Sequence, residues 1–330
     1  MGASFFSNQT FAQIDPLKFG DESATEESPT PRNWQIKTFG GMQFWTDFKN
    51  LRDWRIQQNS ETGHFRLIDP SAVRFAFGSR QQCDAVLAEI ALKEKIRPLN
   101  GRVVILLHGL MRTNASMTPL GEYLREKGKF EIVNFGYAST RKRVQNHAKA
   151  LSQVINNLGK EVTEINFVGH SLGNIVVRRY IGDQAAANQP LDPRIKRMVM
   201  LGPPNQGSRM ARLLKSSFSF KVFAGVSGAE LSDSWQQLEP TLGTPEFEFA
   251  IIAGGQTGPN KINNVLLTGK DDFTVSVEET KLIGANDFQV RPLIHTTMMK
   301  DKIVFEDTLR FFENGYFTSE SARTPLTSLK

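Results

Sequence analysis

The sequence contains very little cysteine and histidine. Cys83 is the only cysteine, so the chain cannot form an intrachain disulfide. Its neighbours read as a helix, and we expect a buried structural thiol. The five histidines are not grouped with one another or with Cys83 at metal-ligand spacing, and no glycine-rich stretch has a phosphate-loop pattern. The sequence therefore predicts no metal site and no cofactor.

Long apolar runs are also missing. No stretch of 18 or more apolar residues occurs, so we expect no transmembrane helix. The N-terminus has neither a basic segment nor a long apolar segment of the kind found in an intact signal peptide. A chain whose signal had been removed would look the same. These absences leave the compartment open, with a cytoplasmic location favoured.

The charge is modestly positive, with a formal net charge of +6 and a pI near 9.4. The basic residues are spread along the chain, and the densest cluster is Arg141-Lys142-Arg143. Solvated helix faces and loops explain such a distribution better than a nucleic-acid site does. We therefore expect no nucleic-acid partner, while transient contact with a membrane or lipid surface stays open. The oligomeric state is not indicated.

The N-terminal third divides into a tail and a β-rich part. Residues 1–34 are polar and acidic, a composition typical of a flexible tail. Residues 35–99 are expected to form a hairpin and a helix, at about 80–95, that pack on the following domain. The β-like segments of this part are 42–45, 53–57 and 64–68, of which the last two make the hairpin.

From residue 100 to about 315 strands and helices alternate, which predicts an α/β fold with a doubly wound parallel sheet. The predicted strands are 102–107, 130–135, 164–168, 196–201, 249–253 and 288–293. The predicted helices are 116–127, 141–158, 172–182 and 301–313. Residues 205–247 interrupt the alternation. They predict either a lid or cap insertion over the sheet edge or a satellite core cluster under a long loop. Residues 316–330 read as a frayed C-terminal tail.

One motif stands at a predicted strand-to-helix junction. Gly169-His170-Ser171-Leu172-Gly173 has the Gly-x-Ser-x-Gly pattern of a nucleophile elbow. The serine of such an elbow occupies a strained turn, and side chains at the two glycine positions would collide with neighbouring backbone. By chance alone, about one chain in ten of this length carries the pattern. Its meaning therefore depends on whether the other catalytic parts follow in order.

A serine nucleophile needs a base, and in this fold the order along the chain is Ser, then Asp or Glu, then His. His295 is the only histidine after Ser171, and it follows a predicted strand. His170 lies in a turn that points its side chain away from Ser171. The segment after the strand at 249–253 offers two neighbouring acids, Asp271 and Asp272. An oxyanion hole would use the N–H of Leu172 and that of Leu110, in the loop His108-Gly109-Leu110.

Residues of about 100–313 resemble the bacterial lipases and esterases of the α/β-hydrolase fold. The stretches that carry the resemblance are 106–110, 169–173, 201–208, 272–280 and 294–299. The resemblance implies a mostly parallel sheet and a serine hydrolase mechanism. It favours Asp272 over Asp271 as the triad acid, because Asp272 aligns with the family's acidic position. The hairpin at 53–68 is consistent with the antiparallel first strands of the same sheet.

The sequence is compatible with three functions. The first is a carboxylic ester hydrolase acting on small-molecule or lipid esters through Ser171, His295 and Asp272. The second is an acyltransferase that uses the same triad with an alcohol in place of water. The third is a non-catalytic binding protein that keeps the fold, against which the intact set of catalytic residue types argues.

Overall fold

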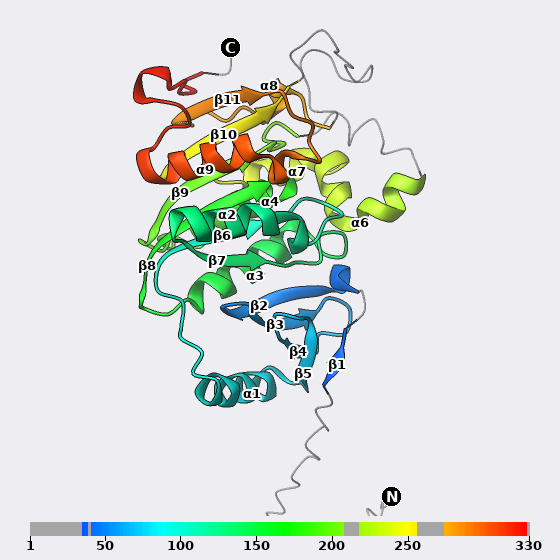
Figure 1. The fold of residues 1–330 in the computed structure, drawn as a ribbon. Coiled ribbons are helices and arrows are strands. Elements are labelled where there is room, and N and C mark those ends of the chain that lie inside the picture. The colour runs from blue at the N-terminus through cyan, green and yellow to red at the C-terminus, as the bar shows by residue number, and fades with distance from the viewer. Residues whose placement is uncertain (1–34, 39–40, 208–217, 256–273, 329–330) are drawn as a thin grey trace, which may run out of the picture. The chain divides into compact units, whose positions relative to one another are not determined.

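Two β-sheets organise the part of the chain that the structure describes. The computed structural model describes residues 35–38, 41–207, 218–255 and 274–328. Of residues 218–223 it describes only the backbone. Within these residues one sheet has five strands and the other has six (Figure 1). Their elements belong to one compact unit, Asn33–Lys330. The predicted tail at 1–34 lies outside the described residues.

The larger sheet is parallel throughout its described pairings, in the order β11-β10-β9-β8-β6-β7. Its strands are β6 (Gly101–Leu107), β7 (Glu131–Phe135), β8 (Val162–His170), β9 (Ile195–Leu201), β10 (Glu248–Gly254) and β11 (Asp287–Arg291). The chain moves from β6 outward to β7, then crosses to β8 on the other side of β6 and continues outward. The carboxyl ends of β6 and β8 therefore meet at a topological switch point, where open α/β sheets bind their ligands.

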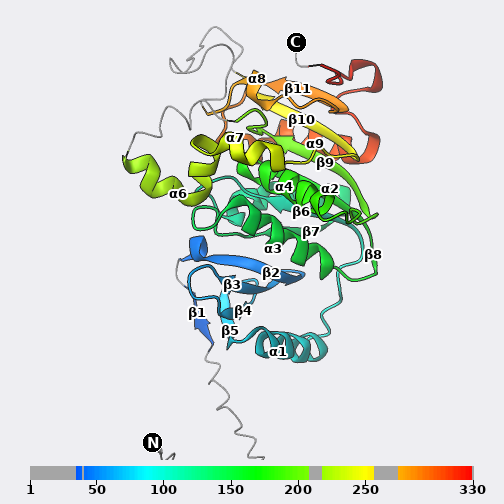
Figure 2. The same cartoon turned by 180° about the vertical axis from the view of Figure 1, so that it is seen from behind.

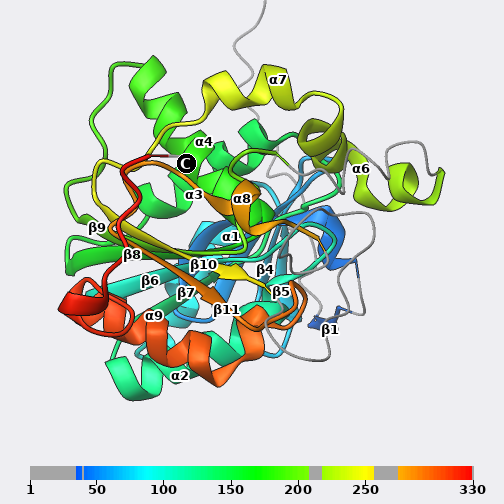
Figure 3. The ribbon, with the colours of Figure 1, turned by 90° about the horizontal axis from the view of Figure 1, so that it is seen from above.

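Helices cover both faces of this sheet. Helices α3 (Val144–Asn156) and α4 (Leu172–Ala186) pack on one face, and α2 (Thr118–Gly128) and α9 (Lys302–Asn314) on the other (Figure 3). The apolar side chains of β6 alternate between the two resulting cores. Burial on both faces explains why that strand reads as an unbroken apolar run. The predicted doubly wound α/β-hydrolase fold is confirmed.

Several short elements complete this part. They are η2 (Asn114–Met117), α8 (Val277–Thr280) and η4 (Met298–Lys300). The capping box of α8 pairs the Ser276 side chain with the Glu279 N–H, and the Glu279 side chain with the Ser276 N–H. The described helices include none that is long and apolar enough to cross a membrane.

The smaller sheet is antiparallel, in the order β1-β5-β4-β3-β2. Its strands are β1 (Ile36–Lys37), β2 (Trp45–Leu51), β3 (Trp54–Asn59), β4 (Phe65–Ile68) and β5 (Val73–Gly78). The predicted hairpin is confirmed as β3–β4, but its expected place in the parallel sheet is wrong, because these strands form a sheet of their own. The predicted β-like segment 42–45 is mostly a 3-10 turn, η1 (Met42–Phe44), that leads into β2.

Helix α1 (Arg80–Lys93) packs on the antiparallel sheet. Its side chains Cys83 and Leu87 are buried against Trp54, Ile56 and Leu67. Burial raises the pKa of the Cys83 thiol to about 11, so the sulfur stays protonated and unreactive at neutral pH. The expectation of a buried structural thiol is confirmed.

The described part of the insertion at 205–247 is helical, with α6 (Phe218–Ser232), α7 (Trp235–Leu238) and η3 (Glu239–Thr241) (Figure 2). Gly225, at φ 61° and ψ −152°, breaks α6. Leu231, Trp235 and Leu238 join the same core cluster as α3 and α4. The C-terminal part of the insertion is therefore integral to the main core and is no separate satellite cluster.

The predicted frayed tail at 316–330 is wrong for its described residues. Phe317 is fully buried, and its N–H donates to Asp287 Oδ2 over 2.8 Å. The N–H of Thr324 donates to the other oxygen of Asp287 over 3.0 Å. The segment, which includes η5 (Glu320–Ala322), is thus fixed to the start of β11.

Candidate active site

Ser171 lies at the junction of β8 and α4, near the switch point of the parallel sheet. Its backbone has φ 52° and ψ −119°, a conformation that non-glycine residues rarely adopt and that costs roughly 1–3 kcal/mol. The Ser171 N–H donates to the Leu201 carbonyl over 2.9 Å, which helps to hold this turn. Only 9% of the residue is exposed. A strained serine at this position is the geometry of a nucleophile elbow.

The two glycines of the motif are each required because a side chain there would collide with a different neighbour. A Cβ on Gly169 would lie 2.3 Å from Asn174 Oδ1, and a Cβ on Gly173 would lie 2.5 Å from the Leu107 carbonyl oxygen. Gly173 thus lets α4 begin directly against the end of β6. The amide of Asn174 also donates to the Ser171 carbonyl over 3.1 Å. Asn174 is a supporting residue that the motif alone did not predict.

The loop after β6 passes close to Ser171. A Cβ on Gly109 would lie 3.2 Å from the Ser171 Cβ and 2.8 Å from His170 Nδ1, so only glycine fits there without displacement. Leu110 follows and packs partly against the main core. This brings the predicted oxyanion loop to the predicted nucleophile. Leu172 is the first residue of α4, where a backbone N–H has no acceptor within the helix and is available to a ligand.

His108 is the first residue of this loop and fixes its backbone. Its ring stacks on Tyr137 with centroids 4.1 Å apart, and the Tyr137 hydroxyl donates to the His108 carbonyl. His108 Nδ1 donates to the Gly109 carbonyl over 2.9 Å. Complete burial lowers the pKa of His108 to about 4, so the ring is neutral at pH 7. His108 is therefore a structural part of the loop, and Tyr137 is a further support that the sequence did not reveal.

The loop that follows β11 brings His295 to the same place. His295 is 6% exposed. The Nε2 atom of His170 donates to the His295 carbonyl over 2.9 Å, and the two rings lie 4.7 Å apart. Since His170 precedes Ser171 in the chain, this contact places the loop of His295 beside the elbow.

The acid of the predicted triad lies outside the described residues, and so does its neighbour. Asp272 and Asp271 both fall in the range 256–273. Asp272 therefore stays a prediction. In the described parts of the chain, no group of three or more His, Cys, Asp or Glu side chains is arranged to hold a metal ion.

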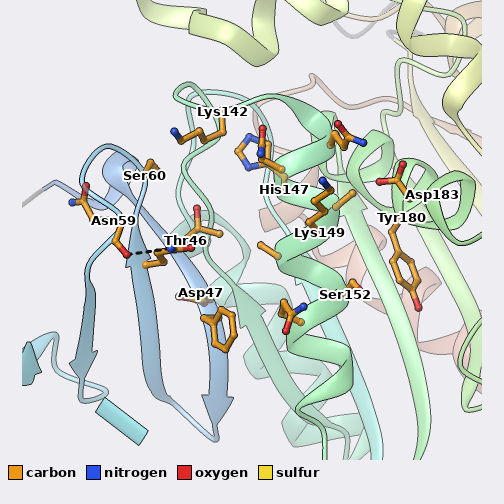
Figure 4. Close-up of a pocket in the computed structure, with 18 of the residues that line it drawn as sticks. Thr46, Asp47, Asn59, Ser60, Lys142, His147, Lys149, Ser152, Tyr180 and Asp183 are labelled. Atoms are coloured by element: carbon orange, nitrogen blue, oxygen red, sulfur yellow. Dashed lines mark hydrogen bonds between the residues drawn. The ribbon is translucent and has the colours of Figure 1, made fainter. Parts of the chain in front are cut away.

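A large cavity lies elsewhere, between the antiparallel sheet and α3 (Figure 4). Its volume is about 930 Å³, and its walls come mainly from β2, the loop after β3 and α3. Polar side chains make up much of its lining, among them Ser60, Lys142, Lys149 and Tyr180. Ser171 and His295 are not part of this lining, so the cavity is separate from the predicted catalytic residues.

One family model matches part of the chain. Described as a domain of unknown function (DUF7379), it matches residues 73–222, a stretch that includes Ser171 but ends before His295. No curated protein matches the chain.

Solved structures similar to this one include lipases, esterases and phospholipases. The mature lipase BlEst2 of Bacillus licheniformis is 15% identical, with 66% of this chain and 92% of that chain covered and a TM-score of 0.45. Phospholipase PlaB of Legionella pneumophila is 19% identical, with 65% and 57% covered and a TM-score of 0.47. The metagenomic carboxyl esterase MGS0156 is 16% identical, with 61% and 67% covered and a TM-score of 0.41. At these identities the likeness concerns the fold alone.

Proposed function

We propose that the protein is a serine hydrolase that cleaves carboxylic esters through an acyl-enzyme on Ser171. The observation that carries the proposal is the strained backbone of Ser171, at φ 52° and ψ −119°, at the carboxyl end of β8. A strain of this kind persists only where the surrounding structure enforces it, and such positions cluster at functional sites. Here Gly109, Gly169 and Gly173 leave the space that this turn requires.

In the proposed reaction neutral His295 removes the proton from the Ser171 hydroxyl, and the oxygen attacks the ester carbonyl. The negative charge that develops on the carbonyl oxygen is stabilised by the N–H groups of Leu172 and Leu110. His295 then protonates the departing alcohol. Water, activated by the same imidazole, hydrolyses the acyl-enzyme. Asp272 holds the imidazole in its productive tautomer and stabilises its cation.

The elements that supply these groups converge for a structural reason. Ser171 follows β8 and the oxyanion loop follows β6, and these neighbouring parallel strands end at the same sheet edge. The expected substrates are small-molecule or lipid esters, the class cleaved by the lipases and esterases that residues of about 100–313 resemble.

The test is hydrolysis of p-nitrophenyl esters with acyl chains of increasing length. We expect activity in the wild type and a loss of about 10⁴-fold or more in kcat for Ser171→Ala and His295→Ala. Ser319→Ala and His64→Ala are matched controls, because each of these side chains hydrogen-bonds within its own segment, and they should retain activity. Equal activity in Ser171→Ala and wild type would contradict the proposal. Rates that rise from acetate to longer chains would identify a lipid-like substrate.

A further inference from the structure

His170 contacts three parts of the proposed site. It is 2% exposed. Its backbone belongs to the elbow, its Nε2 reaches the His295 carbonyl over 2.9 Å, and its Nδ1 faces the oxyanion loop at Gly109. The residue it holds lies 125 positions further along the chain.

The hydrogen bond fixes the state of the His170 ring. A carbonyl oxygen only accepts hydrogen bonds, so Nε2 must carry the proton. Burial holds the pKa of His170 well below its usual value, and the electrostatic effect of the nearby His295 lowers it further. The ring is therefore neutral, with Nδ1 unprotonated. Nδ1 has no hydrogen-bond partner among the described residues. His170 is thus a neutral donor directed at a single acceptor.

The loop around His295 has little regular structure of its own. It lies between the end of β11 and η4, and turns are its main feature. Within the loop, the Thr297 N–H donates to the Ile294 carbonyl over 3.1 Å. The donor from His170 therefore ties this turn to the rigid end of β8. A displacement of about 1 Å at a catalytic group can cost about 10²-fold in rate.

We propose that His170 is a positioning residue, which holds the backbone of His295 so that its imidazole stays aligned with Ser171. This role rests on the proposed function, because it presumes that His295 is the base. Position 170 of the motif then requires a neutral side chain whose N–H donor reaches the His295 carbonyl.

The experiment compares His170→Gln with His170→Met. The two side chains have the same length and similar volume, but only glutamine carries an N–H donor. For p-nitrophenyl butyrate we expect His170→Met to lower kcat about 10²-fold with KM nearly unchanged, since alignment and not binding is lost. His170→Gln should recover most of that loss. Thermal melts of both variants measure any common effect on stability.

Equal kcat values in the two variants would overturn the proposal, whether both match the wild type or both are impaired. A second measurement needs no substitution. In wild-type protein with ¹⁵N-labelled histidine, NMR should show His170 as the neutral tautomer with the proton on Nε2. A proton on Nδ1 or a charged ring would contradict the inferred hydrogen bond, even if His170→Met fails to fold.

Failure of the two proposals can be told apart. If the wild type hydrolyses no ester and Ser171 is unreactive, the proposed function is wrong. If the wild type is active and depends on Ser171 and His295, but His170→Met and His170→Gln behave alike, only the positioning role is wrong.

Discussion

Tyr137 supports His108 in two ways at once. Its ring stacks on the His108 imidazole at an interplanar angle of 14°, and its hydroxyl donates to the carbonyl of the same residue. Both side chains are buried. Because the following residues, Gly109 and Leu110, form the proposed oxyanion loop, the orientation of this peptide bears on where the Leu110 N–H points.

Tyr137→Phe should test this support. The variant keeps the ring but leaves the buried His108 carbonyl without that donor, which costs about 1–3 kcal/mol of unfolding free energy. We also expect a lower kcat for ester hydrolysis, because the oxyanion donor loses its alignment. Urea unfolding and steady-state kinetics measure the two effects. A destabilised variant with wild-type kcat would show that Tyr137 serves stability alone.

Gly173→Ala should destabilise the fold, because the new Cβ would lie 2.5 Å from the Leu107 carbonyl oxygen, a backbone atom that cannot rotate away. Overpacking of this kind costs about 1–3 kcal/mol. Gly159→Ala is the matched control, since no atom lies within 4 Å of a Cβ at that position. Urea midpoints compare the two. Similar midpoints for both variants would contradict the close packing of α4 against β6.

The buried histidines predict an acid-sensitive fold. Burial lowers the pKa of His108 to about 4 and that of His147 to about 3, from a usual value near 6.5. As pH falls from 6.5 toward 4 the unfolded chain binds protons at these positions and the native protein does not, so stability decreases. At pH 5 each histidine accounts for about 2 kcal/mol of this loss.

A substitution at His147 measures how much this residue contributes to the loss of stability at acid pH. His147→Gln cannot titrate, and its amide can still reach the Ser227 hydroxyl, which lies 3.1 Å from His147 Nε2 in the wild type. Urea unfolding at pH 7 and pH 5 should show a smaller drop for this variant than for the wild type. An identical drop would mean that His147 does not contribute a lowered pKa.

Two substitutions decide whether Asp272 or Asp271 is the triad acid. Asp272→Asn should reduce kcat far more than Asp271→Asn, because only the triad acid holds the imidazole tautomer and stabilises its cation. In a serine protease the equivalent change costs about 10⁴-fold. Steady-state hydrolysis of one ester by both variants is sufficient. Equal losses would remove the assignment of Asp272.

Local patterns in the sequence were sufficient to predict the parallel sheet and the elbow. The apolar run of β6 and the glycines around Ser171 act on their immediate neighbours, so their consequences can be read from a short stretch. The hydrogen bond from His170 to His295 joins residues 125 positions apart, and no local pattern encodes it. The same reason explains why Tyr137, which lies 29 positions from His108, was not predicted.

The errors have a similar origin. Strand β5 is partly exposed along most of its length, so it lacks the alternation of buried and exposed positions that would reveal it. The separate antiparallel sheet depends on pairings that no segment specifies alone. Phe317 is buried in the same core cluster as α2 and α9, and Asp287 accepts from its N–H and from that of Thr324. These tertiary contacts lie within a stretch that otherwise reads as a polar tail.

Ser171 is proposed to be an activated nucleophile, and covalent labelling with a fluorophosphonate measures that reactivity. In the folded wild-type protein, peptide mass mapping should find one adduct, on Ser171. Heat-denatured protein and Ser171→Ala should not be labelled. A folded wild type that takes no label at Ser171, or takes it equally after denaturation, would contradict the account.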